Sequence, residues 1–367
     1  MSSPTTKADA IQAELRREIL NQEWKVGDKL PSDGVLAERF GCSIATASKA
    51  VSLLAHDGLV ERRPRAGTRV VRNTPEPEST APQLDSFAFI YPSEQHEGIW
   101  RTVRGFQDAA NASGRRVIML STGSDYRKEA EYISRLSEFD VRGAVIYPVI
   151  PTQQDQVHFS QMLVTAKIPL VLAELNLPGL GCPAVVIDGF HAGYTMARHL
   201  LDKGARRVGF FSNYSWAPFM RDRYLGYRWA MEERGIAMEK ESVLLEPSMR
   251  PDFKDPFREV RELARTYLQK NEKLEAVVCA NDFLARGLID SAHERGLRVP
   301  GDLKVTGIDG YASYMAAPIS LTTYHIPYEE MGRKAFETLS AHVRNRDAEP
   351  VETQVRGHIV AGATSAS

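Results

Sequence analysis

A short polar stretch and an arginine-rich phrase stand out by residue type and spacing. Residues 43–49 read SIATASK, where short hydroxyl side chains are interspersed with small apolar ones, and the phrase ERRPRAGTR follows at residues 61–69. Hydroxyls and lysine can contact phosphates or base edges, and methyl-bearing side chains can contact thymine methyls. Arginines neutralise phosphates without regard to sequence. Together these residue types favour contact with double-stranded DNA.

The elements that must position these residues can be predicted from the first 72 residues. Apolar spacing predicts helices over residues 8–21 and 33–40, with Ser32 as N-cap of the second. Ser43 caps a third predicted helix, which ends at Gly58. The segments LVER and TRVV, joined by RPRAG, predict a two-stranded hairpin. This order predicts a winged helix-turn-helix DNA-binding domain over residues 1–72.

In a helix-turn-helix the second helix enters the major groove with its first residues against the bases. That helix holds only one basic residue near its start, Lys49, so the wing must supply the charge: residues 39–72 contain 7 Lys and Arg against 2 Asp and Glu. The alternative is that Ser43 only caps, Thr46 packs and the arginines form a solvated face. The predicted DNA contacts are Ser32, Ser43, Ile44, Ala45, Thr46, Ser48, Lys49, Arg62, Arg63, Arg65, Gly67, Thr68 and Arg69.

Composition and motifs argue against other classes of protein. The chain has 367 residues, 43% hydrophobic and 25% charged, which is ordinary for two or three soluble domains. We find no apolar run long enough for a membrane span and no apolar signal core, so we expect a cytoplasmic protein without a membrane partner. Cys42, Cys182 and Cys279 are too scattered for a disulfide framework or a zinc site. Without catalytic motifs or metal-ligand spacing, we expect no enzyme, no catalytic residue, no metal and no cofactor.

The rest of the chain has a different pattern. Residues 73–85 are rich in proline and polar residues, which predicts a linker. From residue 86, apolar strands such as SFAFIYP, GAVIYPV and AVVID alternate with amphipathic helices, although no helix is predicted between GAVIYPV and IPLVLAEL. This alternation predicts an α/β fold with two doubly wound parallel-sheet subdomains and a cleft at the carboxyl ends of the strands.

Residues 8–71 resemble the winged DNA-binding domain of the GntR family. The segments GDKLPSDGVLAERFGCS and AHDGLVERRPRAGTRVV follow its pattern PGxxLPSExxLAxxFGVS and LexxGLIxRRxGxGTFV. The family's arginines are replaced here by Gly34, Ile44 and Ser48, its wing-tip glycine by Arg65 and its last aromatic by Arg69. The stretch SIATASKAV instead resembles the recognition helix of LacI/GalR repressors, which implies base reading by the second and third of its residues. We therefore expect an operator unlike that of standard GntR proteins.

Residues 85–363 resemble the sugar-binding domain of LacI/GalR repressors, itself similar to periplasmic sugar-binding proteins. The phrases that carry the resemblance are DGFHAGYTMARHLLDKGARRVGFFS, RDRYLGYRWAMEERG, AVVCANDFLARGLIDSAHERGLRVPGDLKVTGIDG and PISLTTYHIPYEEMG. It implies a periplasmic-binding-protein-like body over residues 86–367, with the chain crossing between subdomains near residues 204, 323 and 349. A GntR head on a LacI-type body is the architecture of the AraR-type repressor family.

The resemblance also implies the residues that bind a small effector. They are Arg223, Asn281 and Asp309 as polar contacts, Ser93 and Asp188 as further candidates, and Trp216 and Phe283 as an aromatic wall, with Trp100 and Phe253 as alternatives. Arg223 matches the arginine that grips ligand hydroxyls, and vicinal hydroxyls need such forked donors. The alternatives are that Asn281 caps its helix, Arg223 forms a surface ion pair and Trp216 packs. Asp282 is expected to act as a cap at the start of its helix rather than as a contact.

The resemblance implies a homodimeric transcriptional repressor that binds a pseudo-palindromic operator and leaves it when a small sugar binds. Arg223 beside carboxylates also permits a phosphorylated or carboxylated ligand, and the ligand could act as corepressor instead of inducer. The competing class is a ligand-binding protein of transport type without a regulatory role.

Overall fold

The computed structural model describes residues 7–56, 58–63, 67–73, 86–92, 97–123, 126–148, 150, 153–213, 215, 217–247, 257–315, 319–346 and 348–366. The chain divides into two compact units, Met1–Gln83 and Leu84–Ser367, which we name the head and the body. Arg65, Ser93, Trp216 and Phe253, all named in the predictions, lie outside the described residues. Each unit is described below by itself.

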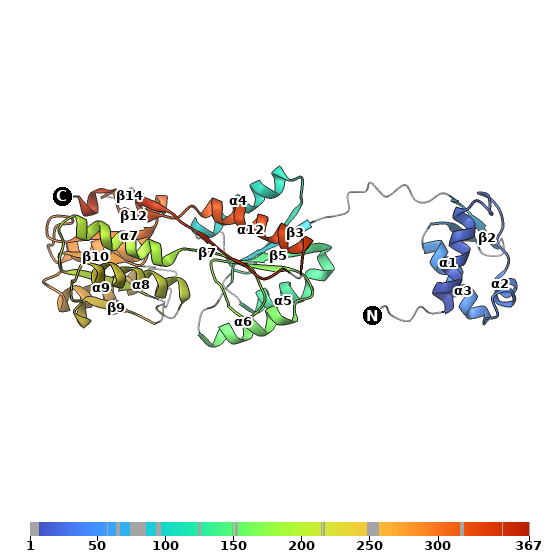
Figure 1. The fold of residues 1–367 in the computed structure, drawn as a ribbon, viewed down its shortest axis with the longest axis horizontal. Helices are drawn as coiled ribbons and strands as arrows, with labels where there is room; N and C mark the ends of the chain where they lie inside the picture. The colour runs from blue at the N-terminus through green and yellow to red at the C-terminus, as the bar shows by residue number, and fades with distance from the viewer. Residues whose placement is uncertain are drawn as a thin grey trace. The chain divides into compact units, whose positions relative to one another are not determined.

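The head is a winged helix-turn-helix, as predicted. Ile11, Leu15 and Ile19 form one buried stripe of the first helix and pack on Val51 and Leu54 of the third. The two wing strands pair antiparallel, from Val60 opposite Val70 to Arg63 opposite Gly67. Its elements (Figure 1) are α1 (Lys7–Leu20), α2 (Asp33–Arg39), α3 (Ile44–His56), β1 (Val60–Arg63) and β2 (Gly67–Val70).

The first subdomain of the body is built on a six-stranded sheet in the order β13-β7-β6-β5-β3-β4, parallel throughout. Helices α4 and α12 pack together on one face, and α5 and α6 on the other. Its elements are β3 (Ser86–Tyr91), α4 (Glu97–Ala112), β4 (Val117–Ser121), α5 (Tyr126–Arg135), η1 (Leu136–Phe139), β5 (Val141–Ile146), α6 (Gln153–Thr165), β6 (Leu170–Ala173), β7 (Ala184–Ile187), α12 (Tyr328–Arg344) and β13 (Glu352–Val355).

The second subdomain repeats this plan with a six-stranded sheet in the order β14-β12-β11-β10-β8-β9, in which only β14 is antiparallel. Helix α7 packs on α8, and α9 packs on α10. Its elements are α7 (Gly189–Asp202), β8 (Val208–Ser212), α8 (Pro218–Glu233), η2 (Lys240–Ser242), β9 (Val243–Leu245), α9 (Arg258–Lys270), β10 (Ala276–Cys279), α10 (Asp282–Glu294), β11 (Lys304–Asp309), α11 (Ala312–Met315), β12 (Thr322–His325), β14 (His358–Val360) and η3 (Ala363–Ser365).

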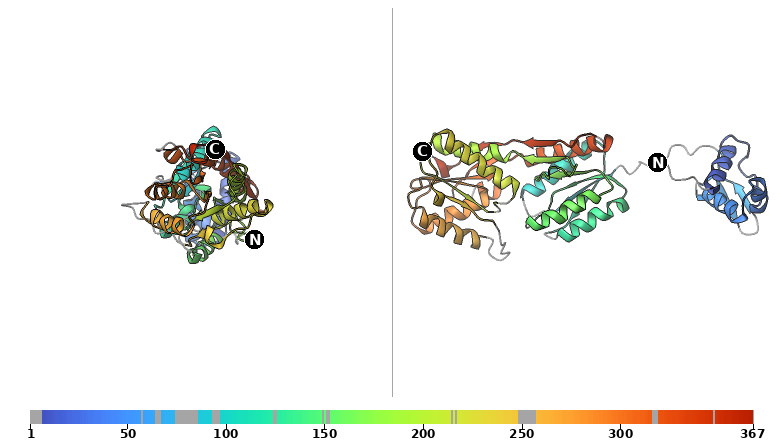
Figure 2. Two further views of the ribbon diagram at one scale, coloured as in Figure 1. Left: turned by 90° about the vertical axis from the view of Figure 1, so that its left-hand side faces the viewer. Right: turned by 60° about the horizontal axis from the view of Figure 1, so that its bottom comes forward.

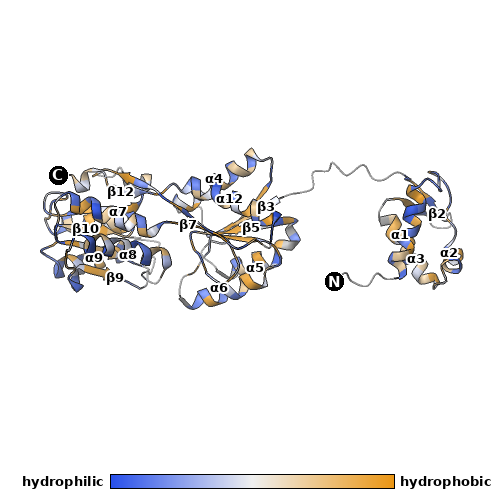
Figure 3. Ribbon diagram, viewed as in Figure 1, coloured by the Kyte–Doolittle hydropathy of each residue, from blue (hydrophilic) through white to orange (hydrophobic). Residues whose placement is uncertain are grey.

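The strands are apolar on both faces because helices cover both sides of each sheet. In β3, Phe87 and Phe89 enter one core while Ala88 and Ile90 enter the other, as the two-residue period of a strand requires. Figure 3 shows the same pattern as hydrophobic strands between helices that carry hydrophilic residues on their outer sides. The predicted α/β body of two parallel-sheet subdomains is confirmed.

The chain passes from one subdomain to the other after β7, after β12 and after β13, and Figure 2 shows these connections running between the two lobes. The first crossing is a correction, because it falls at Asp188 and not near residue 204. Helix α7 packs on α8 and on strands of the second sheet, so it already belongs to the second subdomain. The other two crossings follow His325 and Val355, where positions near 323 and 349 were expected.

Candidate ligand site and nucleic-acid interface

Arg223 is placed by an unusually close contact between helices α7 and α8. A Cβ atom on Gly193 of α7 would lie 1.8 Å from the Arg223 carbonyl oxygen, and one on Gly226 of α8 would lie 2.0 Å from the Phe190 carbonyl oxygen. Only glycines permit this approach. The Arg223 side chain is thereby held inside the body, with 2% of its surface exposed.

The Arg223 guanidinium joins the ends of two strands. Its Nη2 donates to Asp309 Oδ1 at 3.1 Å, at the end of β11, and its Nη1 donates to the Ala280 carbonyl after β10 at 2.5 Å. The Tyr328 hydroxyl donates to the same Asp309 oxygen at 3.2 Å. Arg223 is therefore a buried partner of Asp309 and not a surface ion pair. Its buried Nε–H has no hydrogen-bond acceptor among the described residues.

The backbone conformation of Asp309 and the burial of its carboxyl are both energetically unfavourable. Its φ of 130° lies in a region that residues with side chains rarely adopt. Burial raises the pKa of Asp309 to about 6, against the opposing effect of the Arg223 charge. Strained backbone and perturbed carboxyls concentrate at functional sites, so this strand end fits a ligand site.

Glu174, which the sequence predictions missed, faces the same site from the first subdomain. It follows β6, has a φ of 68° and lies near the Tyr147 hydroxyl after β5. Its electrostatic partners include both Arg223 and Asp309. Burial raises the pKa of Glu174 to about 7, although the Tyr147 hydroxyl and the Arg223 charge oppose the shift.

A cavity of about 130 Å³ lies between the subdomains beside Glu174. Residues after β5 and β6 line it from the first subdomain, and the start of α8 lines it from the second. The wall from α8 includes Pro218 and Phe219, and the Phe219 ring lies 6.0 Å from the Arg223 guanidinium carbon. This cavity opens at the carboxyl ends of strands, where α/β folds bind ligands.

The residues at the start of α10 that were named as effector contacts already contact other residues of the body. Asn281 is the N-cap of α10, because its Oδ1 accepts a hydrogen bond from the Leu284 amide at 2.8 Å. The alternative that Asn281 caps its helix therefore holds for this oxygen. Phe283 is half-buried and lies 4.5 Å from the Phe257 ring centroid. Asp282 is not the cap that was expected, because its buried carboxyl accepts from the Gly310 and Tyr311 amides and from Thr323 Oγ1. Burial raises the pKa of Asp282 to about 7.

Asp188 lies at the first crossing between the subdomains. Its carboxyl caps α7 by accepting from the His191 amide at 2.8 Å, and it accepts from Arg356 Nε at 2.7 Å. These two contacts hold the chain in place at the crossing. The role of Asp188 as a ligand contact stays a prediction. Trp100 lies on α4, and the guanidinium carbon of Arg104 lies over its ring, 4.9 Å from the ring centroid.

Contacts from α4 tie the two subdomains together near the site. The Glu97 carboxylate accepts from the Ala312 amide at 3.0 Å, at the start of α11 in the second subdomain. Gly98 lies against Tyr311 and Tyr328, since a Cβ there would be 2.7 Å from the Tyr311 hydroxyl oxygen. Arg101 donates to Glu329 and to the Ile326 carbonyl at the second crossing. The first turns of α4 thus contact the second subdomain at the start of α11.

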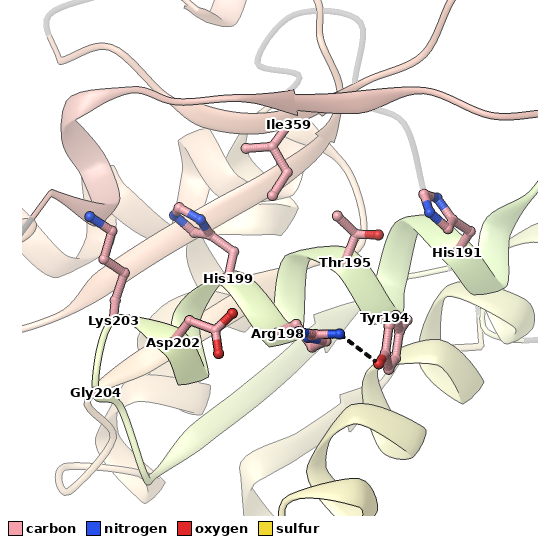
Figure 4. A pocket seen from close by; sticks show the side chains of 9 residues that line it. All are labelled: His191, Tyr194, Thr195, Arg198, His199, Asp202, Lys203, Gly204 and Ile359. Carbon is pink, nitrogen blue, oxygen red and sulfur yellow. Dashed lines mark hydrogen bonds between the residues drawn. The ribbon is translucent and has the colours of Figure 1, made fainter.

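A wider hollow, of about 830 Å³, runs along α7 and β14 (Figure 4). Its polar side chains have partners: Arg198 Nη1 donates to the Tyr194 hydroxyl, and His199 Nε2 lies 2.8 Å from Ser365 Oγ. It contains no predicted effector residue, and its walls come from one subdomain. We therefore place the ligand site at the strand ends around Arg223.

In the head, the start of α3 presents a mostly uncharged surface. Ile44 is 62% exposed, and Ala45 and Lys49 are exposed as well. Ser43 Oγ accepts from the Thr46 amide at 3.1 Å and lies 2.8 Å from Thr46 Oγ1, so both hydroxyls are engaged in capping α3. Ser32 Oγ is the cap of α2. The exposed apolar residues leave this helix suited to contact with base methyl groups.

The wing residues divide into inward and outward positions. Thr68 is 8% exposed on the inner face of β2, and its role as a DNA contact stays a prediction. Arg69 is on the outer face and donates to the Gly27 carbonyl at 2.8 Å. The Arg62 guanidinium pairs with Asp33 and donates to Ser48 Oγ. The Arg63 side chain is outside the described part of the chain.

Similarity to known proteins follows this division into head and body. The pattern of the bacterial regulatory proteins of the gntR family matches residues 7–70, and that of the periplasmic binding protein-like domain matches residues 197–365. An HTH-type transcriptional regulator from Clostridium saccharobutylicum, RegA, is 30% identical over 260 residues, which cover 69% of this chain and 74% of RegA. The chain belongs to the HTH-type transcriptional regulators, with a GntR head and a LacI-type body.

Two further matches extend over nearly the whole regulator. The arabinose metabolism transcriptional repressor of Geobacillus stearothermophilus is 26% identical over 350 residues, covering 93% of this chain and 92% of that repressor. A solved structure of the transcriptional regulator CelR with cellobiose has a TM-score of 0.65 at 19% identity, over 91% of this chain and all of that one. The first match confirms the predicted class of function, and the second shows the fold.

Proposed function

We propose that this regulator is a homodimeric repressor that binds a pseudo-palindromic operator and releases it when a small uncharged sugar closes the body. The two heads of a dimer would contact inverted half-sites, as two-fold symmetry requires. The relatives named arabinose metabolism repressors support the proposal. We further propose that the protein works in the cytoplasm.

The observation that carries the proposal is the buried Arg223 Nε–H, which has no acceptor in the part of the chain that the structure describes. Burying a donor without an acceptor costs about 1 to 3 kcal/mol, which a ligand oxygen would recover. Asp309 and Glu174 stand beside it as acceptors, so one site offers both partners that a hydroxyl needs.

The charge of the site favours an uncharged ligand. Among the described residues, two carboxyls, Glu174 and Asp309, face the Arg223 guanidinium, which is already paired with Asp309. A phosphate or carboxylate would add negative charge to a site whose burial disfavours charge already. A polyol hydroxyl can donate to either carboxyl without this penalty.

Closure would couple the site to the head. A ligand between Glu174 and Arg223 bridges the subdomains, and the three crossings next to it are the positions at which their angle can change. Bound sugar then weakens operator binding, and bound operator weakens sugar binding, by the same coupling free energy, typically about 1 to 3 kcal/mol.

A thermal-shift screen of the full chain with pentoses, hexoses and their phosphates tests the proposal, because a specific ligand stabilises the fold by mass action. We expect one neutral sugar to raise the melting temperature and to lower operator affinity. A ligand that raises operator affinity would make the protein a corepressor-dependent regulator instead. Stabilisation by phosphorylated sugars alone would overturn the charge argument.

A further inference from the structure

Arg62, on the first wing strand, does not extend away from the head into solvent. Its Nη1 donates to Ser48 Oγ and to Ser52 Oγ, both at 3.1 Å, and approaches the Ser48 carbonyl at 3.4 Å. These acceptors belong to α3, the recognition helix. The guanidinium therefore lies against this helix, although it comes from the wing.

Asp33 binds the other terminal nitrogen of the guanidinium. It is the first residue of α2, and its Oδ2 pairs with Arg62 Nη2. A carboxylate near DNA is repelled by phosphates unless it orients a cation. An ion pair between α2 and β1, with the serines of α3 beneath it, restricts Arg62 to one position.

The position of Arg62 coincides with the part of α3 that is expected to read bases. Ile44, Ser48 and Ser52 are spaced four residues apart, so they form one row along the helix. Residue 48 is an arginine in the GntR pattern and a serine here. The helix thus lacks an arginine at position 48, and the guanidinium of Arg62, from the wing, lies beside Ser48 instead.

We propose that Arg62 reads a guanine in the operator and that Asp33 is its positioning residue. This inference rests on the proposed operator binding of the head and assigns Arg62 to specificity instead of the general phosphate grip. Arginine has five N–H donors, so it can donate to the O6 and N7 acceptors of guanine while it keeps contacts with Asp33 and the serines. Base contacts of this kind carry sequence preference, whereas phosphate contacts do not.

Selection from random double-stranded DNA tests the inference with the full chain. The proteins compared are the wild type, Arg62→Met, Asp33→Asn and, as a matched control, Arg17→Met, at an arginine of α1 paired with Glu14. Methionine has no N–H donor and no charge, so we expect Arg62→Met to lose about tenfold or more of the preference for guanine at one base pair of each half-site, with the salt slope unchanged because no phosphate contact is lost. Asp33→Asn should weaken preference at the same base pair, and the control should select the wild-type motif.

Replacing that guanine by 7-deazaguanine, which lacks the N7 acceptor, provides a second readout that does not depend on how the variants fold. The wild type should lose affinity for the modified operator, and Arg62→Met, which has no donor for N7, should be insensitive to it. The inference is overturned if Arg62→Met selects the wild-type motif with equal stringency, or if it loses affinity uniformly with a shallower salt slope. If the wild type itself selects no motif, the proposed function fails first.

Discussion

Arg223 and Asp309 form a buried ion pair, 3.1 Å between Nη2 and Oδ1, that joins helix α8 to the end of strand β11. Asp309 stands at a φ of 130°, and the Nε–H of Arg223 has no acceptor among the described residues. A pair made only for stability would not leave a strained backbone and an orphan donor side by side. The pair is better explained as a prepared ligand site.

Replacing Arg223 by lysine should abolish effector response while the head still binds DNA. Lysine keeps the charge but lacks the planar fork that serves Asp309, the Ala280 carbonyl and a ligand together. We expect sugar affinity to fall at least about tenfold, or about 1.4 kcal/mol. Titration calorimetry measures this loss, with Arg221→Lys, an exposed arginine on the same helix, as control. Equal losses in both variants would show that Arg223 does not contact the ligand.

Glu174→Gln should stabilise the body more at pH 8 than at pH 5. Folding raises the pKa of Glu174 to about 7, so the folded state binds its proton more tightly than the unfolded state. The stability gained from this proton is complete below about pH 4 and disappears as pH rises through 7. Glutamine stays uncharged, so the variant should gain about 1 to 3 kcal/mol at pH 8 relative to wild type.

Urea unfolding of the ligand-free protein at pH 5, 6, 7 and 8 measures this difference. The control is Glu337→Gln, whose exposed carboxylate pairs with Arg333 on α12. A constant difference between Glu174→Gln and wild type at every pH would mean that Glu174 does not titrate in this range.

Much of the head could be predicted because its signals are local. Ser32 and Ser43 mark helix starts, and Gly58 follows the last helical turn, so the bounds of α2 and α3 came out within a residue or two. Helix α6 was missed because its apolar residues do not form a clear stripe along QQDQVHFSQMLVT. The first crossing was misplaced because the pattern of α7 does not say which of two similar sheets it covers.

Glu174 was missed for a related reason. Its partners Tyr147, Arg223 and Asp309 lie far away in the sequence, and the sheet order alone brings β5 and β6 side by side. A polar residue directly after the buried strand LVLA was the available signal. Reading every strand end for polar residues would have found it.

Glu97→Ala should weaken closure of the body. The Glu97 carboxylate joins α4 to the start of α11 across the subdomains, and a charge-assisted hydrogen bond of this kind contributes about 1 to 2 kcal/mol. We expect a several-fold loss of sugar affinity with unchanged operator affinity in the absence of sugar. The control is Glu131→Ala on α5, whose carboxylate pairs with Arg135 of the same helix. Unchanged sugar affinity would remove Glu97 from the closing contact.

The combined change Arg63→Ala and Arg65→Ala should weaken binding to all DNA sequences alike. Two lost phosphate contacts reduce the slope of log affinity against log salt by about 2. Fluorescence polarisation over a salt series measures it, with Ile44→Ala as the contrasting variant, since Ile44 is expected to change base preference. A changed motif at constant salt slope for the arginine variant would contradict the phosphate assignment.

We infer that one small molecule and one operator oppose each other's binding to the same chain. The most direct measurement is operator affinity of the full chain, with and without the sugar that stabilises the body in a thermal-shift screen. We expect this sugar to lower operator affinity about fivefold or more, as a coupling of about 1 kcal/mol requires, and we expect Arg223→Lys to abolish the effect. Operator affinity that stays constant at saturating sugar would contradict it.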